Sequence, residues 1–245
     1  MTTPFSISLL QAVSDWQRGG DAKQQSLRAR TLKSECAALS AQYRTCQLVC
    51  HRQIALVKVG VWDLIGENRL AEKISSWTLD IEVAKKFKGG VPPQGQEFQG
   101  VIFSMHPPPY SVVVSLDKLY RDQAFVDAMK NNQDAISSYQ EGAGRYGGTQ
   151  SEVVLEIAEV TQEDIYSLGG YSSALEKLVS QAADLVYQRP STLAEQQALL
   201  LKANGAGMAA GPSWLSMDAT RRVLARTKPQ AAMLAEIKRR QGRTN

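Results

Sequence analysis

The stretch EGAGRYGGTQSEVVLEI, residues 141–157, contains the features on which the predicted fold and function rest. Four glycines fall within seven residues near its start, and because glycine reaches positive φ at little cost, we expect a loop there. The run at 153–157 is apolar and β-branched, which is typical of a strand. Residues two apart share one face of an extended strand, so Gln150 and Glu152 are expected to project together where the strand begins.

A carboxylate beside a carboxamide at the junction of a loop and a strand is a candidate site. Taken alone, the pattern also fits an exposed strand end. A functional site therefore requires further site residues elsewhere in the chain.

The composition is that of an ordinary globular protein. The chain has 245 residues, of which 43% are hydrophobic and 21% charged, and this size supports one domain or one domain with an appendage. No apolar run approaches the roughly 20 residues that a bilayer-spanning helix needs. The start of the sequence lacks the basic segment of a signal peptide. We therefore expect a cytoplasmic protein, of the producing or of a target cell, without membrane contact.

The three cysteines, Cys36, Cys46 and Cys50, are odd in number and close together. The nearest histidine, His51, adjoins Cys50 and is poorly spaced for a metal cage. We therefore expect reduced, mostly buried thiols, as in a reducing cytosol, and no bound metal.

Apolar periodicity predicts an α+β fold. It is helical over 6–18 and 22–43, and it becomes strand-like over 46–59. The strand-like run contains Arg52, and a guanidinium is costly to bury without an anionic partner. Arg52 therefore forms a fixed ion pair, lies on an edge strand, or binds an anion, for which its planar fork is suited. Further strands are predicted at 74–78, 98–105 and 111–116.

Residues 219–245 form a basic tail with a helical pattern. They hold eight Lys or Arg and one acidic residue, Glu236, although the net charge of the whole chain is only +4. Such a tail either contacts nucleic acid or an acidic protein surface, or is a solvated helix face. Both interpretations stay open at this point.

Three elements occur in a fixed order along the chain. They are the strand arginine Arg52, the block SSWTLDIEVAKKF at 75–87, and the block TQSEVVLE at 149–156. This order resembles the arginine–serine–glutamate class of mono-ADP-ribosyltransferases, the class of the cholera and C3 toxins, over about residues 46–160. Trp77 stands where that family has a central threonine, a departure that a buried Trp77 ring would accommodate.

The resemblance implies a fold and a site. The fold is an ADP-ribosyltransferase-like mixed β-sandwich flanked by N-terminal helices and followed by C-terminal helices. Glu152 is implied to stabilise the oxocarbenium-like cation that forms when NAD loses nicotinamide. Ser76 is implied to orient Glu152 and to line the nicotinamide pocket. Arg52, Ser76 and Thr78 are implied to contact NAD, with Arg52 on the phosphates.

The resemblance also bears on the acceptor of ADP-ribose. Gln150 and Tyr146 are implied to recognise the acceptor, and Gln150 is counted with the catalytic residues. Family members that modify arginine tend to carry glutamate at the position of Gln150, so an acceptor other than arginine is favoured. Nucleic-acid acceptors are also known in the family.

The whole chain is expected to divide into three consecutive parts. These are an N-terminal helical segment (1–45), a catalytic core (46–190) and a C-terminal basic extension (191–245). The expected setting is a bacterial or phage effector, or toxin, acting on a host protein or RNA. Two alternatives stay open, namely an NAD glycohydrolase and a non-catalytic binding module on a degenerate transferase scaffold.

Overall fold

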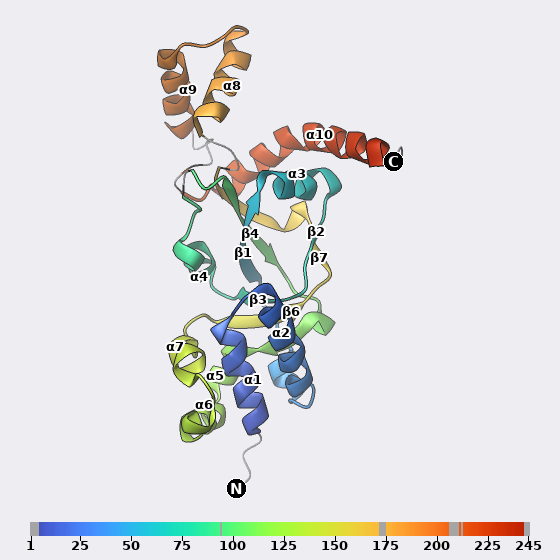
Figure 1. Ribbon diagram of the computed structural model, residues 1–245, viewed down its shortest axis with the longest axis vertical. Helices are drawn as coiled ribbons and strands as arrows, with labels where there is room; N and C mark the ends of the chain where they lie inside the picture. The colour runs from blue at the N-terminus through green and yellow to red at the C-terminus, as the bar shows by residue number, and fades with distance from the viewer. Residues whose placement is uncertain (1–4, 94, 172–174, 206–210, 212, 243–245) are drawn as a thin grey trace. The chain divides into compact units, whose positions relative to one another are not determined.

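The computed structural model describes residues 5–93, 95–171, 175–205, 211 and 213–242 (Figure 1). Helices and antiparallel strands alternate along the chain, which confirms the α+β class. The chain forms two compact units: residues 1–51, 72–83 and 105–158 make the first, and 52–71, 84–104 and 159–245 make the second. Each unit is assembled from separate segments, and the division into three consecutive parts stays a prediction.

Antiparallel strands form the centre of the first unit. Strand β6 (Glu152–Glu156) pairs on one side with β5 (Val112–Ser115) and on the other with β3 (Ile74–Thr78). The register places Ser76 opposite Val154 and Thr78 opposite Glu152. Because directly opposed residues point to the same side of a sheet, Ser76, Thr78 and Glu152 share one face.

Helices gather around these strands in the lower part of Figure 1. They are α1 (Ile7–Arg18), α2 (Ala22–Cys36), α5 (Leu116–Arg121), α6 (Gln123–Asn131) and α7 (Ala143–Tyr146). Val154 packs in one apolar cluster with Leu10 and Val13 of α1 and Leu32 of α2. The face of the strands that carries Glu152 is therefore the face that α1 and α2 cover.

Helix α1 has well-defined ends. The Ser6 side chain accepts a hydrogen bond from the Leu9 amide at 3.2 Å, as a helix N-cap does. The helix stops at Gly19, whose φ of 73° is the left-handed conformation that glycine adopts most easily. The last turn of α1 therefore has a fixed position, and it contains Trp16 and Gln17.

The glycine-rich stretch differs from the predicted loop. Residues Ala143–Tyr146 form the short helix α7, and of the stretch's glycines only Gly148 has positive φ, at 71°. Gly142 is needed for close approach instead, since a Cβ built on it would lie 2.2 Å from the Ser14 carbonyl oxygen of α1. The Ala143 amide also donates to the Ser14 hydroxyl at 3.2 Å. The stretch is thus packed against α1.

Two predicted elements are longer than the observed ones. The helix predicted over 22–43 ends at Cys36, and the strand predicted over 46–59 starts at Cys50. Between them, a 3₁₀ turn buries Tyr43, whose hydroxyl donates to the Asp122 carboxylate. This tertiary contact, which local periodicity does not reveal, ends the helix early.

The second unit has its own strands and helices. Strand β1 (Cys50–Val57), which belongs to this unit from Arg52 onward, neighbours β4 (Phe98–Met105), and β4 pairs antiparallel with β8 (Ile165–Gly170). Strands β2 (Leu70–Ala71) and β7 (Glu159–Val160) form a separate pair. The remaining helices are α3 (Lys58–Glu67), α4 (Ile81–Lys86), α8 (Leu175–Tyr187), α9 (Leu193–Gly205) and α10 (Met217–Gly242).

Helix α10 confirms the predicted helical tail and is anchored in the second unit. A Cβ on Gly66 of α3 would lie 2.5 Å from the Ala231 carbonyl oxygen, so α10 lies directly on α3. Just before α10, the Leu215 amide donates to the Leu168 carbonyl of β8 at 2.9 Å. Throughout the described part of the chain, helices fall short of the length or the apolarity that crossing a membrane requires.

The contact between α7 and α1 is testable by mutation. We expect Gly142→Ala to destabilise the protein by about 1–3 kcal/mol, because the added methyl group meets backbone that can yield only if α1 shifts. Thermal unfolding measures the effect. Gly60→Ala is the matched control, since its Cβ would make an ordinary 3.7 Å contact with Leu56; equal destabilisation by both variants would contradict this packing.

Candidate active site

Ser76 and Glu152 meet on the covered face of the first unit. Glu152 is the first residue of β6 and is only 5% exposed. The Ser76 hydroxyl of β3 donates a hydrogen bond to Glu152 Oε1. The structure therefore brings together the two residues that the sequence motifs placed at the centre of the site.

Helix α1 supplies two further contacts to the same carboxylate. The indole Nε1 of Trp16 donates to Glu152 Oε1 at 2.7 Å. Gln17, the next residue of the helix, lines the pocket beside Glu152, and its side chain acts to lower the pKa of that carboxyl. Sequence reasoning missed both residues, because Trp16 fitted the helical periodicity as an irregular apolar position and Gln17 carried no motif. An indole in the last turn of a helix that covers the predicted site was the available signal.

Burial controls the protonation of Glu152. Desolvation by burial raises the pKa of Glu152 above its ordinary value of 4.5, while hydrogen bonds from Ser76, Trp16 and Gln17 act in the opposite direction. The ionised carboxylate is thus costly in this place and is maintained by neutral donors. Carboxylates with perturbed pKa values in such surroundings are candidates for catalysis.

Gln150 reaches the site by a route that differs from the prediction. The strand begins only at Glu152, and Ser151 has a φ of 43°, so 150–152 is not an extended run. The prediction that strand alternation places Gln150 and Glu152 on one face is therefore wrong. Both residues nevertheless line one pocket. The left-handed turn at Ser151 brings Gln150 there.

Thr78 holds this turn in place. Its hydroxyl donates to the Gln150 carbonyl at 2.7 Å and accepts from the Asp80 amide at 3.1 Å. The Leu79 amide donates to the Ser151 carbonyl at 3.0 Å. In the structure, Thr78 thus has a structural task, and its predicted contact with NAD stays a prediction.

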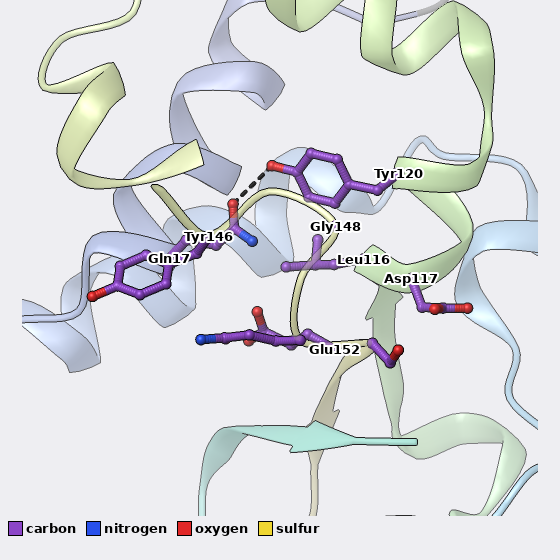
Figure 2. A pocket seen from close by; sticks show the side chains of 9 residues that line it. Gln17, Leu116, Asp117, Tyr120, Tyr146, Gly148 and Glu152 are labelled. Atoms are coloured by element: carbon purple, nitrogen blue, oxygen red, sulfur yellow. Dashed lines mark hydrogen bonds between the residues drawn. The ribbon is translucent and has the colours of Figure 1, made fainter. Parts of the chain in front are cut away.

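The pocket beside Glu152 is small and mostly polar. Figure 2 shows Gln17, Tyr120, Tyr146 and Glu152 around it. Its empty volume is about 170 Å³, part of which is open to solvent. Its lining consists of Gln17, Leu116, Asp117, Tyr120, Tyr146, Gly148, Gln150, Ser151 and Glu152. All of these residues belong to the first unit.

Two charged or aromatic members of this lining already have partners. Asp117 forms an ion pair with Arg121, with 3.0 Å between Oδ2 and Nε. The Arg145 guanidinium lies over the ring of Tyr146, 5.2 Å from the ring centre. The half-buried Tyr146 is held at the pocket from the short helix α7.

The other residues singled out from the sequence have clear places. Trp77 is 2% exposed and its indole donates to the Ser75 hydroxyl at 3.0 Å, so the ring is buried as the departure from the family pattern required. Arg52 is a half-buried residue of β1 in the second unit. Its role as a ligand of the NAD phosphates stays a prediction.

The cysteines are free thiols: Cys36 and Cys50 are buried and Cys46 is half-buried. Among the described residues, His, Cys, Asp and Glu nowhere form a group of three or more that could hold a metal ion. Comparisons with protein-family models, with curated proteins and with solved structures found no match to this chain.

The buried carboxylate predicts a pH-dependent stability difference. A glutamate whose pKa is raised by folding destabilises the native state once the pH exceeds its unfolded value, and the loss grows until the folded pKa is passed. We therefore expect Glu152→Gln to gain stability relative to wild type as the pH rises through this window. Below it, both side chains are neutral and the difference should shrink.

Denaturant unfolding at a series of pH values measures this difference. Glu156→Gln is the matched control, because Glu156 is an exposed carboxylate on the same strand that pairs with Lys33 at 2.6 Å. A stability difference for Glu152→Gln that does not vary with pH would contradict a raised pKa at Glu152.

Proposed function

We propose that the chain is an NAD-dependent mono-ADP-ribosyltransferase, which cleaves NAD and transfers ADP-ribose to a macromolecular acceptor. One observation carries the proposal. Ser76, from the block SSWTLDIEVAKKF, donates a hydrogen bond to Glu152, from the block TQSEVVLE, although the two residues are 76 positions apart in the sequence. The two motifs that resemble the family thus converge on one buried carboxylate.

The chemistry of the reaction needs such a carboxylate. Breaking the bond between nicotinamide and ribose develops positive charge on the ribose, and a fixed negative charge beside it lowers the barrier. In this proposal Glu152 supplies the charge and accepts a hydrogen bond from a ribose hydroxyl. Ser76 keeps the Glu152 side chain oriented across the pair of strands.

The proposal includes a fold, the ADP-ribosyltransferase-like mixed β-sandwich with flanking N-terminal helices and following C-terminal helices. It is supported by the order of β5, β6 and β3 in the first unit, in which the serine and glutamate strands are antiparallel neighbours. It is also supported by the cover of α1 and α2 on the face that carries Glu152.

The pocket beside Glu152 is the proposed place for one end of NAD, because it is lined by the proposed catalytic carboxylate and by Gln150. We assign the nicotinamide end to this pocket. The phosphates then need a cation elsewhere, and Arg52 is the proposed residue. Thr78 contributes by holding the backbone at Gln150.

The acceptor is proposed to be a protein side chain other than arginine, or a nucleic acid. Gln150 and Tyr146 line the pocket together with Glu152, which supports their proposed contact with the acceptor. Helix α10 supports a polyanionic partner, since its described basic side chains are exposed. They are Arg221, Arg222, Arg226, Lys228, Arg239 and Arg240. An effector of a bacterium or phage, acting in the cytoplasm of a target cell, is the proposed setting.

Incubation with labelled NAD and a cell lysate tests the activity. We expect the purified chain to release nicotinamide and to attach the labelled ADP-ribose to a macromolecule, which nuclease and protease digestion then classify. Release of nicotinamide without labelling of a macromolecule would identify the chain as an NAD glycohydrolase and not as a transferase. If NAD is not consumed, both enzymes are excluded and a binding module is left.

The site assignment is tested by variants in the same assay. Loss of one group that stabilises transition-state charge typically lowers kcat by about 100- to 1,000-fold, and we expect at least this loss for Glu152→Gln. Ser76→Ala should also slow NAD cleavage, because the carboxylate loses a donor. Glu156→Gln should retain wild-type activity, and a fully active Glu152→Gln would remove Glu152 from the mechanism.

A further inference from the structure

We propose that Trp16 and Gln17 are positioning residues, which hold the Glu152 carboxylate ionised and oriented for the reaction. The catalytic consequence rests on the proposed function, whereas the effect on Glu152 itself does not. The inference makes the last turn of α1 a part of the site, beyond the packing role expected for the N-terminal helices.

Two hydrogen-bond donors converge on Glu152. Trp16 Nε1, at 2.7 Å, and the Ser76 hydroxyl both donate to the same oxygen, Glu152 Oε1. An indole N–H can only donate. Donors aimed at one oxygen favour the ionised form of a carboxylate over the neutral acid.

Tyr120 orients the side chain of Gln17. The Tyr120 hydroxyl donates to Gln17 Oε1 at 2.8 Å, as the dashed line in Figure 2 shows. Burial, and then the charge of Glu152, raise the pKa of Tyr120, so the phenol stays protonated and can donate. With its oxygen occupied by Tyr120, Gln17 presents its NH₂ group to Glu152. Tyr120 thus fixes the direction of the Gln17 amide.

The charge of Glu152 needs stabilisation inside the pocket. The described residues that line the pocket contain no Lys, Arg or His, and their titratable members besides Glu152 are Asp117, Tyr120 and Tyr146. Asp117 is itself paired with Arg121. No cation of the lining therefore offsets the charge of Glu152. Hydrogen-bond donors from α1 and β3 are what remains to stabilise it.

Helix α1 is anchored in the core of the first unit. Leu10 and Val13 are 0% exposed in the core of the first unit. Ser14 lies two residues before Trp16. It packs closely against Gly142, and its hydroxyl accepts a hydrogen bond from the Ala143 amide of α7. Donors on such a helix are preorganised, so they need no rearrangement when charge develops in the pocket.

Trp16→Phe tests the inference because it keeps an aromatic ring and removes only the N–H donor. The loss of a hydrogen bond to a charged group is enough to raise the pKa of Glu152 by about one pH unit and to lower kcat by about 10- to 100-fold. We expect the pKa of Glu152, followed by NMR of the labelled carboxyl carbon, to rise. The acid limb of the plot of kcat against pH for NAD cleavage should also move to higher pH, with little change in KM.

Two further variants separate positioning from general destabilisation. Tyr120→Phe should raise the pKa of Glu152 by a smaller amount, because Gln17 loses the bond that orients it. Trp214→Phe is the control, since this variant also loses an indole hydrogen bond, of 2.9 Å to the Lys85 carbonyl, but none to Glu152. An unchanged pKa of Glu152 in Trp16→Phe would overturn the inference. A raised pKa in a protein that never cleaves NAD would uphold it and refute the proposed function.

A different observation carries a second inference. Cys46 Sγ and Cys50 Sγ lie 3.7 Å apart, on either end of a turn in which both thiols point to the Leu48 carbonyl. We infer that these two thiols form a reversible disulfide, which makes Cys46–Cys50 a site of oxidative modification. A bond of about 2.05 Å requires only a small approach from this distance.

The chemistry balances with hydrogen peroxide as the oxidant. The half-buried Cys46, as its thiolate, attacks one peroxide oxygen and becomes a sulfenic acid, while the other oxygen leaves as water. The Cys50 sulfur then attacks the Cys46 sulfur, the S–O bond of the sulfenic acid breaks, and the hydroxyl leaves as a second water with the proton of the Cys50 thiol. Burial raises the pKa of Cys50, which assigns the first attack to Cys46.

Treatment of the full chain with hydrogen peroxide tests this inference. Intact mass should fall by two hydrogen atoms, and peptide mapping should join Cys46 to Cys50 in a form that dithiothreitol reverses. Cys36→Ser should behave like wild type, because Cys36 is buried elsewhere in the core. Cys46→Ser should lose the reaction. Stable oxidation of Cys46 to sulfinic acid, or no reaction of Cys46 and Cys50 with peroxide, would contradict the assignment of a reversible disulfide.

Discussion

The buried carboxylate of Glu152 is the constraint on which the first unit depends. A glutamate with only 5% of its surface exposed is unfavourable unless donors surround it. Ser76 comes from the neighbouring strand, and Trp16 and Gln17 come from the helix above. Each donor requires an element to be fixed in position, so one polar group links β3, β6 and α1.

The packing of α1 follows from that requirement. Its apolar side enters the core with Leu10 and Val13, while its last turn brings the Trp16 indole to Glu152 and the Gln17 side chain to the pocket. The close approach of Gly142 to Ser14 joins α7 to the same helix. The pocket is thereby lined by residues of α1, α5 and α7 around the first residue of β6. Stability and the candidate chemistry therefore depend on the same contacts.

Part of this arrangement could be predicted from sequence. The strand that starts at Glu152 follows from its β-branched run, whereas the expectation that Ser76 and Glu152 meet rested on the resemblance of their two motifs to a family. The N-terminal helix follows from its period. These features are local, and local patterns are what residue spacing encodes.

Other parts depend on tertiary contacts that no local pattern shows. Ser151 adopts a left-handed backbone conformation that glycine normally occupies. The prediction that strand alternation places Gln150 and Glu152 on one face is therefore wrong. The glycines near 142–148 looked flexible, yet Gly142 serves close packing against α1. Trp16 looked like an apolar residue, and only its distance to Glu152 reveals the donor. The place of Arg52 relative to the pocket stays a prediction.

The rate of nicotinamide release from NAD, measured against pH on the purified chain, tests the central claim most directly. The account predicts a rate that rises as Glu152 ionises, with a midpoint equal to the pKa that NMR assigns to the Glu152 carboxyl. Absence of nicotinamide release, or a rate that ignores the ionisation of Glu152, would contradict it.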